Sequence, residues 1–244
     1  MRPYHIFWQG YNHKSGGVRA LYSLNNELKK RDVDVSLSKN NVDKKSIVIY
    51  PEVIPNNPAQ SHQSVHWLLN KAKVNKESMI FAWESGMGKY PLLTVNIIEL
   101  NIWVPQNVKK KGVAYWIGKG TENFNASLIP HGAVEISRSN FPNRNELASF
   151  VAGLDYLISF DPFSALNVEA AICNTPVVIH SSNQKWSKEE IVNHGWTKYG
   201  IGWGIDELEL AKSTVHKARD HYESLLKIFD NRIDNFIELT QDNW

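Results

Sequence analysis

Short apolar runs alternate with helical stretches along this sequence, and this alternation restricts the fold more than any other feature. Nine runs are short and apolar enough to be strands buried on both faces. They are residues 4–8, 33–37, 47–50, 79–83, 102–104, 113–117, 127–129, 156–160 and 176–179. Between the first two lies a helical pattern with Ala20, Leu21, Leu24 and Leu28 on one face. Strand, crossover helix and strand in succession predict parallel sheets and an α/β fold.

The chain of 244 residues is long enough for two domains of ordinary size. A lysine-rich stretch after Pro105 ends at Gly112, and a predicted strand follows it. We therefore predict an N-terminal domain over residues 1–111 and a C-terminal domain over residues 112–244, with a ligand-binding cleft between them. The segment 207–240 is predicted to form one long helix or two joined helices that pack on the protein, and its last part could return to the first domain.

The composition is that of a soluble globular protein, with 42% hydrophobic and 21% charged residues. A formal net charge of +2 does not favour a nucleic-acid partner. Basic runs such as residues 109–111 are interpreted as solvated, with contact to an anionic membrane surface as the alternative. Because no secretory signal and no membrane-spanning apolar stretch is evident, we expect a cytoplasmic protein, with peripheral contact at the inner membrane face left open.

Cysteine, histidine and tryptophan give little indication of a reactive or metal-binding site. The single cysteine, Cys173, has apolar neighbours that predict a core residue and not a nucleophile. His62 and His66 are spaced to share a helix face, but no further ligand is evident nearby, so neither a metal nor another cofactor is predicted. Three tryptophans in the C-terminal half are interpreted as core residues, with stacking on a sugar as the alternative. They are Trp186, Trp196 and Trp203.

The most informative stretch for function runs from residue 156 to residue 180. A predicted strand leads into Asp161, and Ser164 is then a good N-cap for a helix. The unpaired backbone N–H groups at such a helix start favour a phosphate. Glu169, one turn inside the helix, could accept hydrogen bonds from the hydroxyls of an adjoining ribose. One acid before a helix and one within it also occur by chance, so the spacing alone leaves a structural role equally open.

Asp161 and Glu169, with seven residues between them, resemble the acidic pair of retaining glycosyltransferases of the GT-B fold, in particular family 4. The surrounding residues are similar to those of bacterial members, including rhamnosyltransferase-like ones; they are residues 161–166, 169–171, 176–178 and 199–204. The usual pair is two glutamates, so the aspartate is a departure that shortens the reach by one methylene. The resemblance implies two Rossmann-like domains that face each other across a cleft.

The resemblance also implies roles for individual residues. Glu169 would hold the ribose of the donor, Asp161 would lie near the transferred sugar, and Lys119 would neutralise the leaving phosphates. Apart from the resemblance, His131 ends the strand predicted over 127–129 and is expected to border the cleft. The residues predicted to bind the donor are thus Gly16, Gly17, Lys119, His131, Ser164, Ala165, Leu166 and Glu169, and those predicted to act in catalysis are Lys119, Asp161 and Glu169.

Together these features predict a glycosyltransferase that moves a hexosyl or deoxyhexosyl group from a nucleoside-diphosphate sugar to a hydroxyl. The expected acceptor is a saccharide or a lipid-linked glycan, the expected role is glycan or polysaccharide synthesis, and the anomeric configuration is expected to be retained. Two alternatives stay open. One is a non-catalytic GT-B-like protein that binds a nucleotide or glycan or serves as a partner subunit, and the other is a nucleotide-sugar epimerase on the same fold.

Overall fold

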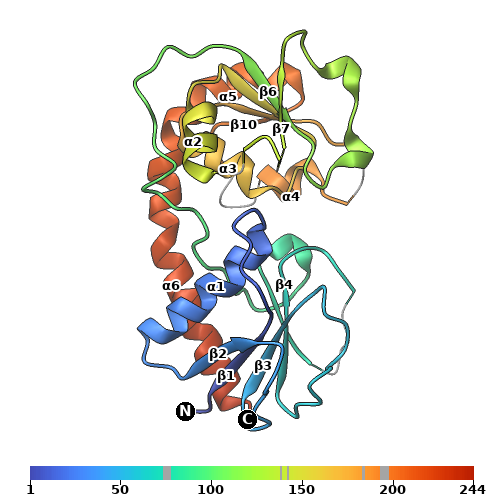
Figure 1. The fold of residues 1–244 in the computed structure, drawn as a ribbon, viewed down its shortest axis with the longest axis vertical. Coiled ribbons are helices and arrows are strands. Elements are labelled where there is room, and N and C mark those ends of the chain that lie inside the picture. The colour runs from blue at the N-terminus through green and yellow to red at the C-terminus, as the bar shows by residue number, and fades with distance from the viewer. Residues whose placement is uncertain (74–77, 138, 142, 183–184, 193–197) are drawn as a thin grey trace. The chain divides into compact units, whose positions relative to one another are not determined.

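The chain forms two compact units, and each is described by itself (Figure 1). A computed structural model describes residues 1–244 except 74–77, 138, 142, 183–184 and 193–197. The first unit comprises Met1–Ile97 together with Leu226–Trp244, and the second comprises Ile98–Leu225. Helix α6 (Ala218–Asp242) contributes residues to both.

The division between the units falls earlier than the sequence suggested, after residue 97 instead of residue 111. The intervening segment belongs to the second unit because hydrogen bonds tie it there. The backbone N–H of Lys111 donates to the carbonyl of Gly153 at 2.8 Å. The guanidinium of Arg219 donates to the carbonyls of Trp103 and Leu100, at 2.9 and 3.2 Å.

The first unit is built on a five-stranded sheet in which every strand pairing is parallel. Its strands are β1 (Tyr4–Phe7), β2 (Val35–Ser38), β3 (Ile47–Pro51), β4 (Ser64–Leu68) and β5 (Met79–Ala82). Their order across the sheet is β2-β1-β3-β4-β5. Strands β3 and β4 are buried along their whole lengths, as expected for central strands of a parallel sheet.

Helix α1 (Gly16–Lys30) is the crossover between β1 and β2, as the apolar spacing predicted. Its four predicted core residues, Ala20, Leu21, Leu24 and Leu28, are all buried. The helix begins after Ser15, whose hydroxyl accepts from the backbone N–H of Val18 at 3.3 Å. The C-terminal part of α6 adds Phe236 to the same unit, where its ring packs on Tyr4 and Phe81.

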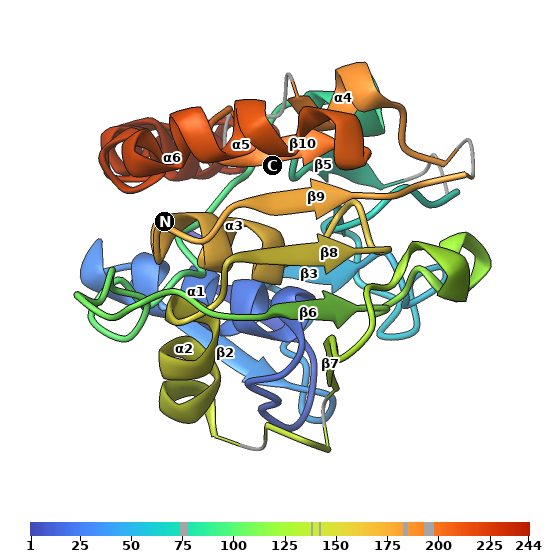
Figure 2. The ribbon, with the colours of Figure 1, turned by 90° about the horizontal axis from the view of Figure 1, so that it is seen from above.

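The second unit holds another five-stranded parallel sheet, in the order β10-β9-β8-β6-β7. Figure 2 shows β6, β8 and β9 running in the same direction. The strands are β6 (Val113–Trp116), β7 (Val134–Ile136), β8 (Tyr156–Ser159), β9 (Val177–Ile179) and β10 (Ile201–Trp203). The helices of this unit are α2 (Arg144–Ala152), α3 (Ala165–Ile172), α4 (Lys188–Val192) and α5 (Leu208–Thr214), followed by the start of α6.

Two of the predicted strands are wrong. Residues 102–104 form a turn, in which the N–H groups of Ile102 and Trp103 both donate to the carbonyl of Glu99. Ser127 and Leu128 belong to the short 3-10 helix η3 (Ala126–Leu128), and Ile129 directly follows it. Three observed strands, β4, β7 and β10, were not predicted.

His62 and His66, whose spacing would let them share a helix face, do not lie in a helix. His66 lies in the central strand β4 and is completely buried, whereas His62 is exposed in the turn before it. The segment 207–240 resolves into two joined helices, α5 and α6, which was one of the two predicted forms.

Both sheets have the strand order 2-1-3-4-5 of a Rossmann-like α/β unit when their strands are numbered within each unit. In this topology the second strand lies on one side of the first strand, and the third strand lies on the other side of the first strand. Ligands bind at the carboxyl ends of the two strands where the direction reverses. In the second unit those strands are β6 and β8. None of the helices that the structure describes is long and apolar enough to cross a membrane.

Candidate functional site

The second unit brings two predicted site residues together at the carboxyl ends of β6 and β8. Lys119 lies in the turn that follows β6, and Asp161 lies two residues after β8. The backbone N–H of Lys119 donates to Oδ2 of Asp161 at 2.9 Å. Asp161 is buried, whereas the Lys119 side chain is exposed. A lysine open to solvent is therefore anchored by its backbone at the reversal point of the sheet.

Two glycines allow the turn around Lys119 to approach β8 this closely. Gly118 has a φ of +53°, and an added Cβ would lie 2.5 Å from both Oδ2 of Asp161 and Nε1 of Trp116. At Gly120 an added Cβ would lie 1.8 Å from the carbonyl oxygen of Phe160. Neither position has room for a side chain, so this packing requires glycine on both sides of Lys119.

Burial raises the pKa of the Asp161 carboxyl, and the neighbouring groups oppose that effect only in part. The opposing groups are the N–H and the charge of Lys119, the N–H of Phe163 and the charge of Lys185. The raised pKa means that folding favours the protonated carboxyl. At a pH between the pKa of Asp161 in the unfolded chain and its higher pKa in the folded protein, the carboxyl takes up a proton when the chain folds.

We expect this carboxyl to make the wild type less stable, relative to an Asp161→Asn variant, as the pH rises above about 4. Below the unfolded pKa both states are protonated and the pH-dependent difference disappears. The measurement is the free energy of unfolding in urea for both proteins between about pH 4 and pH 7. If the free energies of unfolding of the two proteins changed with pH in parallel, the raised pKa of Asp161 would be contradicted. A constant difference between the two curves would reflect only the altered hydrogen bond.

Helix α3 begins next to this turn, and its N-cap is the predicted Ser164. The hydroxyl of Ser164 accepts from the N–H of Leu166 at 3.4 Å and from Nε1 of Trp116 at 3.0 Å. The second bond attaches the helix start to the end of β6. Ser164 and Ala165 are partly exposed, so this helix start is not covered by other side chains.

The tryptophans near this helix have different environments. Trp186 is 3% exposed, and its ring stacks on Phe163 with centroids 4.3 Å apart, which confirms the prediction of a core residue. Trp203 in β10 is partly exposed, and Trp196 lies outside the described residues.

Glu169 is buried inside α3 and forms an ion pair that was not predicted. Its Oε1 accepts from Nη2 of Arg144 at 2.9 Å, and the Glu169 side chain is only 3% exposed. Nε of Arg144 donates to Oε2 of Glu99 at 2.6 Å, and its guanidinium carbon lies 5.4 Å from the ring centroid of Trp103. Asp161 and Glu169 are thus held by different partners, the first by the turn after β6 and the second by Arg144.

The ion pair could have been anticipated only in part. A carboxylate in an apolar helix such as 165–173 requires a cation nearby, because a buried unpaired charge is costly. Arg144 opens α2, which follows β7, so its position at the carboxyl edge follows from the parallel topology. The identity of the cation does not follow from any local sequence pattern.

The three remaining predicted donor-binding residues are His131, Gly16 and Gly17. His131 is exposed in the turn that precedes β7, and so lies on the amino side of that strand. The expectation that it ends a strand is therefore wrong. Gly16 and Gly17 belong to the first unit, where they begin α1. A Cβ at Gly17 would make only an ordinary contact, at 3.6 Å from Leu69 Cδ1, so the fold itself does not require this glycine.

Cys173 is confirmed as a core residue. It is completely buried, and burial raises the pKa of its thiol to about 12, which removes the thiolate needed for nucleophilic attack. Among the residues placed by the structure, no group of three or more His, Cys, Asp or Glu side chains is arranged to hold a metal ion.

No protein-family model matches this sequence, and no curated protein matches it as a relative. The site at the ends of β6 and β8 and the resemblance of its motif are therefore the features that indicate a function.

Proposed function

We propose that the chain is a glycosyltransferase of the GT-B type, with its nucleotide-sugar bound at the carboxyl edge of the second sheet. The observation that carries the proposal is the meeting of Lys119, Asp161 and the start of α3 at the strands where the sheet order reverses. An exposed ammonium and a partly exposed helix start are both suited to a diphosphate. Asp161 positions the backbone of Lys119 in this arrangement.

The proposed reaction breaks the bond between the anomeric carbon and the diphosphate oxygen. The oxygen of an acceptor hydroxyl bonds to the same carbon on the same face, so the configuration is retained, and its proton passes to the leaving diphosphate. Negative charge builds on the diphosphate as the bond breaks. The ammonium of Lys119 and the N–H groups at the start of α3 would stabilise that charge, which is how such sites lower the barrier.

Glu169 is proposed to accept hydrogen bonds from the 2′- and 3′-hydroxyls of the ribose of the nucleotide. Nη2 of Arg144 donates to Oε1 of this carboxylate at 2.9 Å, which holds the carboxylate in place inside α3. Burial lowers the pKa of Arg144, but the charges and hydrogen bonds of Glu169 and Glu99 raise it by more, so the arginine stays charged beside this carboxylate.

One observation favours the non-catalytic alternative. The carboxyl of Asp161 already accepts from the N–H of Lys119, and its position corresponds to the first member of the acidic pair. A carboxyl committed to the backbone is less available to the transferred sugar. A protein that binds a nucleotide-sugar without turnover would keep Lys119 and the helix start. It would lose only the contact between the Asp161 carboxyl and the transferred sugar.

The first experiment is a thermal-shift screen against UDP-, GDP-, dTDP- and CMP-linked sugars, since a ligand specific for the folded state raises its Tm. The best donor is then incubated with and without saccharide acceptors, and the products are identified. Transfer to an acceptor supports the glycosyltransferase. Binding without product supports the non-catalytic alternative, and an epimerised donor without acceptor supports the epimerase.

We expect Lys119→Met to weaken binding of that donor at least about tenfold, because a charged hydrogen bond to phosphate is lost. Lys44 is also exposed in a turn but belongs to the first unit, so Lys44→Met is the matched control and should bind normally. Affinities are measured by calorimetric titration. Equal affinity of Lys119→Met and wild type would refute the placement of the diphosphate.

For Glu169 we expect Glu169→Gln to lose discrimination between the nucleotide and its 2′,3′-dideoxy form. The wild type should bind the hydroxylated nucleotide about tenfold more tightly, because the dideoxy form leaves the carboxylate without its partner. The comparison uses the ratio of two affinities within each protein, so a uniform loss of stability does not affect it. A wild type that binds both forms equally would assign Glu169 a structural role only.

A further inference from the structure

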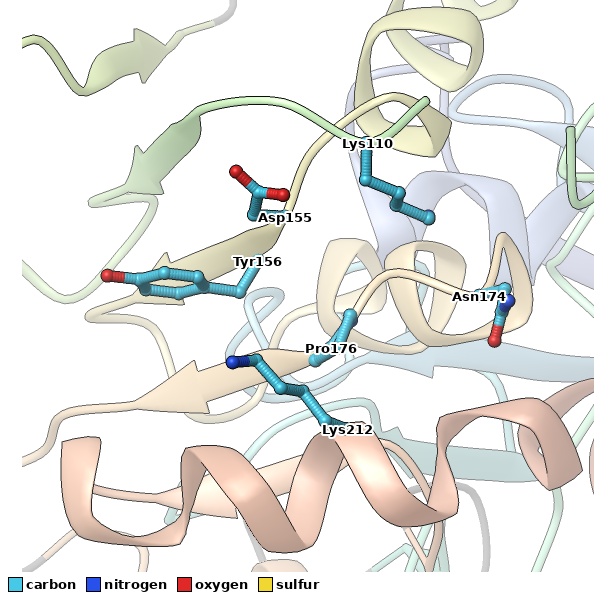
Figure 3. A pocket seen from close by; sticks show the side chains of 6 residues that line it. All are labelled: Lys110, Asp155, Tyr156, Asn174, Pro176 and Lys212. Atoms are coloured by element: carbon cyan, nitrogen blue, oxygen red, sulfur yellow. The ribbon is translucent and has the colours of Figure 1, made fainter. Parts of the chain in front are cut away.

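A cavity opens in the second unit at the edge of the sheet opposite Lys119 and Asp161 (Figure 3). Its volume is about 420 Å³, which is within the range of small-molecule sites. It is lined by Lys110, Asp155, Tyr156, Asn174, Pro176 and Lys212. Tyr156 begins β8 and Pro176 directly precedes β9, so the cavity lies at the amino ends of these strands. Lys119 and Asp161 follow β6 and β8 and lie at the carboxyl ends.

Two lysines supply positive charge to this cavity from different segments. In Figure 3 the side chain of Lys110 extends from the segment before β6, and that of Lys212 extends from α5. Pro176 lies between them in this view. The ammonium of Lys110 donates to the carbonyl of Ala152 and to Oγ1 of Thr175, both at 2.9 Å. These two bonds fix Lys110 and use two of its three donors.

Lys212 is held much less firmly than Lys110. Its ammonium pairs with Glu209 at 2.8 Å, on the surface of the same helix and three residues away. The two side chains are 44% and 82% exposed, so solvent screens the pair and its contribution is small. Lys212 can therefore turn toward an anion in the cavity at little cost.

The same cavity also carries hydrogen-bond acceptors. Oδ1 of Asn174 is buried and has no hydrogen-bond partner in the part of the chain that the structure places. A buried acceptor in this condition is costly unless a ligand or water satisfies it. The carboxylate of Asp155 accepts from the N–H of Gly112 at 2.7 Å and retains further acceptor positions.

We propose that this cavity binds a small phosphomonoester that also carries hydroxyl groups, such as a phosphorylated polyol or sugar. Its phosphate lies between Lys110 and Lys212, and its hydroxyls donate to Asn174 and Asp155. A phosphate dianion matches two ammonium groups in charge and offers three acceptor oxygens. Burial lowers the pKa of Lys110, and a bound dianion would oppose that effect by stabilising its charged form.

The test is a calorimetric titration of the full chain with glycerol 3-phosphate, inorganic phosphate and glycerol. We expect one saturable site for glycerol 3-phosphate, weaker binding of inorganic phosphate and none of glycerol. Lys212→Met should weaken binding of glycerol 3-phosphate at least about tenfold. The matched control is Lys30→Met, because Lys30 forms the same kind of surface pair with Glu27 in the first unit, and it should change nothing.

Four results would overturn the proposal. The first is the absence of saturable binding. The second is equal weakening by Lys30→Met, which would indicate an effect of net charge alone. The third is loss of binding in Lys119→Met with Lys212→Met unaffected, which would place the phosphate at the other edge of the sheet. Vesicles of anionic phospholipid provide the last arm: binding to vesicles without binding to glycerol 3-phosphate would make this a membrane contact and also refute the site.

Discussion

Replacing Arg144 with methionine is expected to destabilise the second unit by about 3–5 kcal/mol, because the buried carboxyl group of Glu169 would lose the cation that pairs with it. The Glu169 side chain is 3% exposed and that of Arg144 is 13% exposed, so water cannot replace the lost partner easily. Methionine keeps much of the packing volume of arginine over Trp103 and removes the charge. The measurement is urea unfolding at neutral pH, followed by tryptophan fluorescence.

Arg31→Met is the matched control for this effect. Arg31 contacts three acids. The side chains of Asp230 and Asp234 are about 60% exposed and can be solvated when the arginine is lost, and Glu27 keeps its pair with Lys30. We expect Arg31→Met to cost about 1 kcal/mol in total, clearly less than Arg144→Met. In the double variant Arg144→Met with Glu169→Gln, most of the loss should be recovered, since the glutamine carries no charge. If that double variant were as unstable as Arg144→Met alone, the cause would be lost packing and not an unpaired carboxylate.

The sequence predicted best those elements whose burial depends on local pattern. The stripe of Ala20, Leu21, Leu24 and Leu28 can face a core only as a helix, and it does. The apolar runs that became β3 and β8 are short and flanked by polar residues, so only a buried strand suits them. The N-cap at Ser164 follows from the hydroxyl and the helical residues after it.

The elements that were not predicted depend on pairing with distant parts of the chain. Strand β4 contains the polar residues Ser64 and His66, so its sequence does not look like that of a buried strand. It is nevertheless buried, and it pairs with β3 on one side and β5 on the other. Strands β7 and β10 have only three residues each, too few to show a period. The candidate site divides in the same way: Asp161 and the helix start could be predicted, but the Arg144 cation comes from another helix, 25 residues earlier.

Gly120→Ala is expected to destabilise the second unit by about 3 kcal/mol or more, the upper range for overpacking in a rigid site. The new Cβ would lie 1.8 Å from the carbonyl oxygen of Phe160 and 2.9 Å from the backbone nitrogen of Asp161. Both are backbone atoms, so no rotation of a side chain can relieve the clash. The turn after β6 would have to move away from β8, which would also break the bond from the N–H of Lys119 to Asp161.

Gly17→Ala separates this steric effect from a general effect of replacing glycine. Gly120 has a φ of −96°, so alanine there carries no penalty for a left-handed backbone, and the expected loss is purely steric. At Gly17, in α1, the Cβ would meet only Leu69 Cδ1 at an ordinary 3.6 Å. Because alanine favours the helix, we expect Gly17→Ala to stabilise the first unit by up to about 1 kcal/mol. A Gly120→Ala protein with the stability and nucleotide-sugar affinity of the wild type would show that the turn does not lie against β8, and the Lys119 site would lose its structural basis.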